Sequence, residues 1–104
     1  MHIDDLMQAL PETYLHADRQ LILRAYQRAE QAHQNQKRAS GEPYINHCIS
    51  VALILAELRV PPEVIAAGLL HDTVEDTLVS LDDLKRDFGV EIATLVDGVT
   101  KLHQ

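Results

Sequence analysis

Hydrophobic residues recur along this chain at intervals of three and four, the spacing that puts them on one face of an α-helix. The longest such segment is Leu15–His33, whose other face carries arginines and a glutamate. Two later segments, Ile45–Leu58 and Pro62–Val74, are apolar on almost every face. This pattern predicts helices that are buried, with Ile45–Leu58 central in the domain.

Turn and cap residues divide the pattern into separate helices. Pro62 suits the first position of a helix, and Ser80 with Asp83 resembles a capping box in which Asp replaces Glu. Gly89 is suited to end the helix that follows Ser80. Gln34–Pro43 is polar and predicts an irregular loop. The predicted helices cover residues 3–10, 15–33, 45–58, 62–74, 81–88 and about 90–101.

Composition supports an all-α domain. The chain has 104 residues, 4 glycines, 4 prolines and 4% aromatic residues, and it is rich in Ala and Leu. That length allows one small domain, and that composition favours helices over strands. The fold class expected from the residues is therefore a helical bundle.

Charge and cysteine content exclude several functions. Nine Lys and Arg against sixteen Asp and Glu give a net charge of −7, which disfavours direct binding of nucleic acid by bulk charge. No run of apolar residues is long enough to span a membrane, and the acidic start is unlike a signal peptide. Cys48 is the single cysteine, so no internal disulfide forms and we expect a cytoplasmic location.

The strongest chemical signal is the cluster His71, Asp72, Glu75 and Asp76, where an apolar helix ends. His71 and Asp72 can reach one metal ion from the same helix wall, and Glu75 and Asp76 each lie one turn after one of them. Nitrogen and oxygen donors together suit manganese, iron or zinc better than calcium. The alternative is that the carboxylates simply face water. The apolar residues that lead directly into the cluster favour burial of His71, and buried charges need partners.

Other polar residues carry weaker signals. His47 either completes a metal site, if its helix packs beside the helix of His71, or is a core histidine bonded to a backbone carbonyl. His33 is expected to be a helix C-terminal cap. Arg38, next to Lys37, either binds an anion or is solvated, and Tyr44 either anchors the loop or offers a stacking surface.

Three stretches resemble the RelA/SpoT family. They are the segments Arg38–His47, Ala66–Thr77 and Leu95–Leu102, the last preceded by Phe88-Gly89. With the residues between them, the resemblance covers roughly residues 20–102 of the chain. These are long, ordered motifs, and they are more specific than any single dipeptide within them.

The resemblance implies an all-α HD-domain metal-dependent phosphohydrolase, a helical bundle truncated at its C-terminus. Its implied activity is (p)ppGpp 3′-pyrophosphohydrolysis, which converts guanosine tetra- or pentaphosphate to GDP or GTP plus pyrophosphate in stringent-response control. The implied cofactor is Mn²⁺, and the implied partner is a guanine nucleotide, ppGpp or pppGpp.

Site residues carry over position by position from the same resemblance. The metal ligands it implies are His47, His71 and Asp72. The implied catalytic residues, which activate the attacking water, are Glu75 and Asp76. The implied substrate-binding residues are Arg38 on the guanine side, Ser40 in the same loop, and Tyr44. Because the acidic pair is intact, the resemblance points to the hydrolysing branch of the family.

The chain departs from the family pattern in two ways. Cys48 stands where the family usually has Pro, which affects the start of a helix without removing a ligand. The family's fourth metal ligand, an Asp in a later helix, would lie beyond Gln104, as would the synthetase and regulatory domains. We therefore expect residues 1–104 to be the N-terminal part of an HD hydrolase domain. The fourth ligand would then be missing, or water or a neighbouring chain would replace it.

Three alternatives stay open at this point. The first is an HD phosphohydrolase that acts on another nucleotide, such as a dNTP or a cyclic dinucleotide; the Arg38–Tyr44 loop argues against it. The second is a non-catalytic regulatory module that binds nucleotide or a partner domain, and nucleotide binding without metal would indicate it. The third is a folding unit without activity, whose exposed apolar face would lead to a homo-oligomer.

Overall fold

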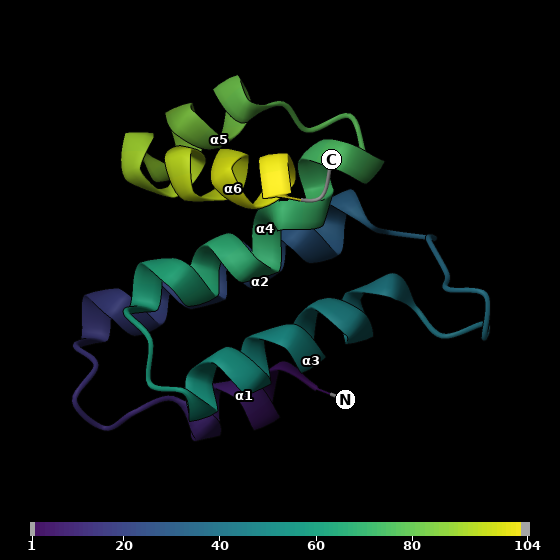
Figure 1. The fold of residues 1–104 in the computed structure, drawn as a ribbon. Coiled ribbons are helices and arrows are strands. Elements are labelled where there is room, and N and C mark those ends of the chain that lie inside the picture. The colour runs from purple at the N-terminus through teal and green to yellow at the C-terminus, as the bar shows by residue number, and fades with distance from the viewer. Residues whose placement is uncertain (1, 103–104) are drawn as a thin grey trace.

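The computed structural model describes residues 2–102, and these residues form helices and no strand. Figure 1 shows the helices, which are α1 (Ile3–Ala9), α2 (His16–Ala32), α3 (Tyr44–Glu57), α4 (Pro62–Asp76), α5 (Leu81–Phe88) and α6 (Val90–Leu102). Every predicted helix is present, with ends within two residues of the prediction. The all-α fold class expected from the sequence is confirmed.

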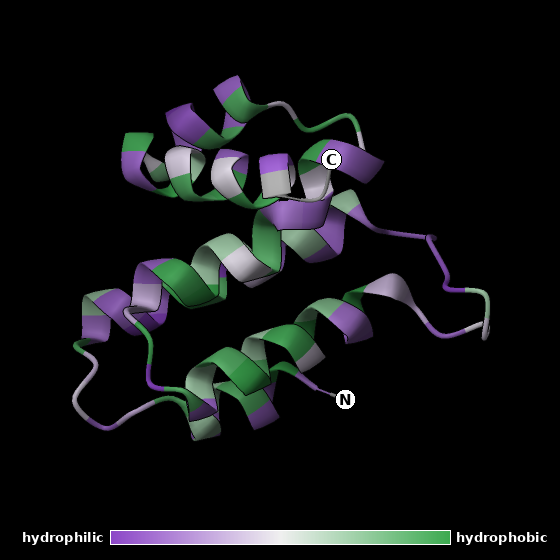
Figure 2. Ribbon diagram, viewed as in Figure 1, coloured by the Kyte–Doolittle hydropathy of each residue, from purple (hydrophilic) through white to green (hydrophobic). Residues whose placement is uncertain are grey.

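Helix α4 is the centre of the domain. It packs against α2, α3 and α6, while α1 covers α3 and α5 covers α6 (Figure 1). Its apolar residues explain this position, because Ile65, Leu69 and Leu70 are fully buried. Figure 2 shows hydrophobic colouring along most of α3 and much of α4, and these two helices pack against one another. The C-terminal end of α4, where the polar cluster lies, is therefore held by the helices around it.

Local signals set the helix ends where the sequence places them. Ser80 Oγ accepts a hydrogen bond from the Asp83 backbone N–H at 3.1 Å, and Asp83 Oδ2 accepts one from the Ser80 N–H at 3.0 Å. This is the predicted capping box. Gly89 ends α5 with a φ of 96°, a left-handed conformation that glycine adopts at little cost.

The expectation that Ile45–Leu58 is the central, buried helix is wrong. Helix α3 lies at the edge of the domain, and Ile54 and Leu58 keep 59% and 67% of their surface exposed. The reason is that α1, α2 and α4 cover only part of its circumference, which leaves apolar side chains without a neighbour. None of the described helices is long and apolar enough to cross a membrane.

Candidate metal centre

Two helix ends and one loop form the candidate site. Helix α4 brings His71 and Asp72 in its last two turns, and the first turn of α3 brings Tyr44 and His47. The polar segment 33–43 connects α2 to α3 and passes beside the end of α4, where the Gln36 side chain bonds to the Asp76 carbonyl. Because α4 continues to Asp76, two residues beyond its predicted end, Glu75 and Asp76 remain helical.

His71 and Asp72 form a close pair. His71 Nε2 lies 3.1 Å from Asp72 Oδ1, and the two side chains are 12% and 9% exposed. His71 Nδ1 lies 2.7 Å from the Gly68 carbonyl oxygen, which can only accept, so Nδ1 carries the hydrogen. With Nδ1 held by the backbone carbonyl, Nε2 is the nitrogen that could bind a metal, and without a metal it donates to Asp72 instead. The pair therefore places one nitrogen and one oxygen that could bind a metal 3.1 Å apart.

Each member of the pair shifts the pKa of the other. The hydrogen bond from His71 lowers the pKa of Asp72 from its usual 3.8 to about 2, against the opposing effect of burial, and Tyr44 lowers it further. The hydrogen bond to Asp72 raises the pKa of His71, again against burial. Asp72 is therefore an anion throughout the physiological pH range, as a metal ligand must be.

Tyr44 contacts the candidate metal site directly. Its hydroxyl donates to Asp72 Oδ2 at 2.8 Å, while Asp72 Oδ1 faces His71. Burial, and then the bond to Asp72, raise the pKa of Tyr44, so the phenol stays protonated and keeps donating. In this structure Tyr44 orients a carboxylate, and its predicted contact with a nucleotide stays a prediction.

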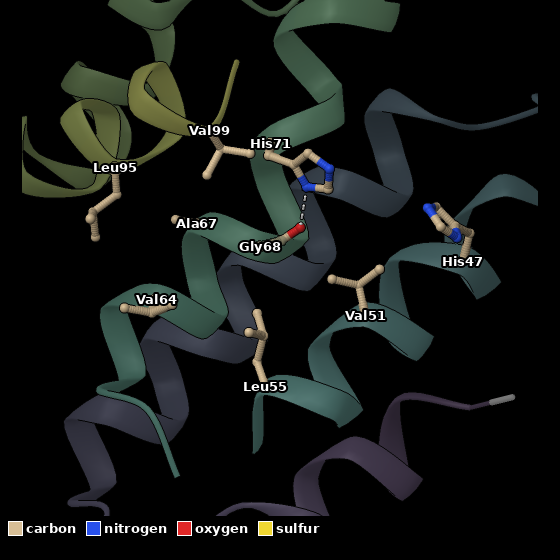
Figure 3. A pocket seen from close by; sticks show the side chains of 9 residues that line it. All are labelled: His47, Val51, Leu55, Val64, Ala67, Gly68, His71, Leu95 and Val99. Carbon is tan, nitrogen blue, oxygen red and sulfur yellow. Dashed lines mark hydrogen bonds between the residues drawn. The ribbon is translucent and has the colours of Figure 1, made fainter. Parts of the chain in front are cut away.

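His47 lies across a pocket from the pair. The pocket, of about 410 Å³, is lined by His47, His71 and mostly apolar residues of α3, α4 and α6. Figure 3 shows His47 and His71 on the two facing helices, with Val51 below them. Within residues 2–102 no group of three or more His, Cys, Asp or Glu side chains is close enough to hold a metal ion. The structure thus joins His71 with Asp72 and leaves His47 on the opposite wall.

The acidic pair Glu75 and Asp76 is exposed on the last turn of α4. Glu75 is close enough to His71 to raise the pKa of its imidazole. The charge of Asp76 raises the pKa values of Tyr44 and Cys48. Both carboxylates therefore lie near the His71–Asp72 pair and remain open to solvent.

Arg38 and Ser40 lie in the exposed loop that enters α3. The Arg38 backbone N–H donates to the Glu42 carbonyl at 2.8 Å, and the Gly41 N–H donates to the Arg38 carbonyl at 2.8 Å. Gly41 has a φ of 89° in this turn. The loop is thus a closed turn in which the Arg38 side chain is exposed.

Sequence reasoning missed the roles of His33 and Gln36. The predicted position of His33 at the C-terminal cap of α2 is correct, but the imidazole is buried against Tyr44 and does not face solvent. Gln36 bonds to both His33 and the last residue of α4. The only signal in the sequence was the position of His33 at the end of a predicted helix and of Gln36 within the predicted loop.

Cys48 is buried beside the site, as expected for a packed hydrophobe. Burial first, and then the negative charge of Asp72, raise the pKa of its thiol to about 12. At pH 8 the folded protein should therefore present no reactive thiolate. We expect a maleimide or disulfide reagent to label Cys48 at least tenfold more slowly in the folded protein than in guanidinium. Equal rates in both states would contradict this burial.

Comparison with known proteins places these residues in a family. A family model described as HD domain matches residues 25–104. A GTP pyrophosphokinase of Streptomyces coelicolor is 62% identical over 83 residues, which are 80% of this chain and 10% of that protein. The bifunctional (p)ppGpp synthase/hydrolase SpoT of Escherichia coli K12 is 46% identical over 105 aligned residues, which are 100% of this chain and 15% of that protein. The chain thus spans a small fraction of the length of these relatives.

Proposed function

We propose a function that starts from the family of this chain, which belongs to the HD domain family and within it to the RelA/SpoT family. In this proposal the chain is the hydrolase part of a (p)ppGpp enzyme. In this proposal residues 1–104 form the N-terminal part of the HD domain. Its reaction is removal of the 3′-pyrophosphate from guanosine tetra- or pentaphosphate. A relative from Escherichia coli O157:H7, also 46% identical, is named guanosine-3′,5′-bis(diphosphate) 3′-pyrophosphohydrolase.

The observation that carries the proposal is the His71–Asp72 pair. Its two donor atoms are 3.1 Å apart, and a backbone carbonyl and a tyrosine hydroxyl bond to the remaining nitrogen and oxygen. Mixed imidazole and carboxylate donors with such outer partners suit manganese, iron or zinc, and the family resemblance favours Mn²⁺ among these. We infer that His71 and Asp72 hold Mn²⁺, and that the His47 side chain, which lies across the pocket in this structure, turns toward them to complete the ligand set.

Each remaining residue has a part in the proposed reaction. A bound cation supplies the positive charge that binds and polarises the 3′-pyrophosphate. Glu75 and Asp76 orient a water molecule and accept its proton as its oxygen attacks phosphorus. The bond between phosphorus and the ribose 3′ oxygen breaks, pyrophosphate leaves, and the 3′ oxygen takes up a proton.

Arg38 and Ser40 hold the nucleotide from the loop in this proposal. The guanidinium of Arg38 is exposed and can stack on a guanine or pair with a phosphate. A local cation is useful because the chain as a whole carries a net charge of −7 and repels an anionic substrate. We further infer a cytoplasmic location, where this substrate would be found.

A direct assay tests the proposal. Pyrophosphate release is measured from ppGpp with Mn²⁺, and dGTP and cyclic di-GMP serve as comparison substrates. With Mn²⁺ present, we expect release from ppGpp and not from dGTP or cyclic di-GMP, and we expect EDTA to abolish the release from ppGpp. Release from dGTP or the cyclic dinucleotide instead would favour a different HD phosphohydrolase. Nucleotide binding that is independent of metal, without release, would overturn the proposal in favour of a regulatory module.

A further inference from the structure

His33 is a buried histidine behind the proposed metal site. It is 3% exposed, and its ring stacks on Tyr44 with ring centroids 4.6 Å apart and an interplanar angle of 27°. Its Nε2 is buried and has no hydrogen-bond partner among residues 2–102. An unpaired buried polar atom costs free energy, so an imidazole is a costly choice for packing alone.

Gln36 fixes the orientation of this ring. Its Nε2 donates to the Asp76 backbone carbonyl at 3.1 Å, so its amide oxygen turns toward His33. That Oε1 lies 2.9 Å from His33 Nδ1. Because an amide oxygen only accepts, Nδ1 must carry the hydrogen, and a neutral His33 then has only a lone pair on Nε2. In this tautomer the unpaired Nε2 of His33 carries no hydrogen, so no buried N–H of this ring lacks an acceptor.

Tyr44 connects His33 to the proposed ligand Asp72. One face of its ring stacks on His33, and the ring meets His47 edge-on, with centroids 5.6 Å apart at 71°. Its hydroxyl reaches Asp72 Oδ2 at 2.8 Å. The position of the Tyr44 ring therefore sets the direction in which the Asp72 carboxylate points.

We propose that His33 and Gln36 are positioning residues that hold Tyr44 against Asp72 and so set the metal affinity of the site. The inference rests on the proposed function only in taking Asp72 as a metal ligand. Gln36 also lies in the segment that carries Arg38, and its backbone carbonyl accepts from the Tyr44 N–H at 3.0 Å. The same contacts thus join the nucleotide-binding loop to the end of α4.

A double-mutant cycle on Mn²⁺ affinity tests the inference. The variants are Tyr44→Phe, Gln36→Leu and their combination, with Gln34→Leu as a matched control in the same segment, and free Mn²⁺ is measured by electron paramagnetic resonance. Changes to the outer partners of ligands weaken metal binding about 10–100-fold. We expect a loss of about 10-fold for Tyr44→Phe and about 3-fold or more for Gln36→Leu, with no change for Gln34→Leu.

Non-additivity separates positioning from general damage. If Gln36 acts through Tyr44, Gln36→Leu should weaken Mn²⁺ binding no further in the Tyr44→Phe background. His33→Phe keeps an aromatic ring but lacks the Nδ1–H. It should weaken Mn²⁺ binding in the wild-type protein and cause no further weakening in the Tyr44→Phe background. Equal losses in both backgrounds, or no loss in the wild-type background, would overturn the inference. Thermal melts check that each variant folds.

Nuclear magnetic resonance of the metal-free protein gives a second readout. We expect the ¹⁵N shifts of His33 to show a protonated Nδ1 and a bare Nε2, and Gln36→Leu to speed the flipping of the Tyr44 ring while Gln34→Leu does not. If these results hold but the protein binds no Mn²⁺, the proposed function fails and the positioning of Tyr44 stands. If Mn²⁺ binds but His33 shows the other tautomer and ring flipping is unchanged, the positioning inference fails.

Discussion

Replacing His71 by alanine should weaken Mn²⁺ binding at least about 100-fold and abolish release of pyrophosphate from ppGpp. The reason is that His71 supplies the only nitrogen donor beside Asp72 Oδ1, at 3.1 Å, within the pair that we take as the core of the metal site. Loss of a direct ligand should cost more than the 10–100-fold that loss of an outer partner costs. Titration with Mn²⁺ measures the effect on binding, and a pyrophosphate assay measures turnover.

His16→Ala is the matched control for this variant. His16 is exposed in the first turn of α2, so its removal takes away an imidazole without touching the site. We expect wild-type Mn²⁺ affinity in His16→Ala. An unchanged dissociation constant in a folded His71→Ala protein would show that His71 is not a ligand.

Removing the charges of the acidic pair should stop turnover while metal binding persists. Glu75→Gln and Asp76→Asn keep the size of each side chain but cannot accept a proton from water. Both residues are exposed, so little change in fold stability is expected. A positioned general base contributes about 10²–10⁴-fold to rate, and we expect a fall in kcat in that range for at least one variant. The Mn²⁺ dissociation constant should change only a few-fold.

The two measurements together define the role of the acidic pair. Glu91→Gln, in the exposed first turn of α6, is the control for removing a negative charge elsewhere and should keep full activity. If Mn²⁺ binding falls as much as kcat in Glu75→Gln or Asp76→Asn, the residue is a ligand. If both variants keep wild-type kcat, the assignment of water activation to this pair is wrong.

The chain shows how much of a site can be predicted when its residues are close in sequence. His71 and Asp72 are adjacent, and Glu75 follows one turn later, so helical geometry alone predicts their proximity. The capping box at Ser80 and the glycine that ends α5 were predicted for the same reason, because a helix end depends on the few residues around it. Family resemblance added the roles of residues that lie in other segments.

Contacts between segments could not be predicted in this way. The bond from Tyr44 to Asp72 spans 28 positions and that from Gln36 to Asp76 spans 40, so both depend on how α3 and the loop pack on α4. His47 was placed in the metal set on the condition that α3 and α4 pack together. They do pack, but its side chain lies on the far wall of the pocket.

The sequence by itself determined the helices, their ends and the chemical identity of the polar cluster, because periodicity, caps and i to i+4 spacing are local properties. Only the tertiary structure decided that α4 rather than α3 is central, since burial depends on which faces find a neighbour. It also decided that Tyr44 supports Asp72 and that His33 lies buried behind it. These contacts follow from the packing of α2, α3 and α4 around one another. No short segment of the sequence carries enough information to predict that packing.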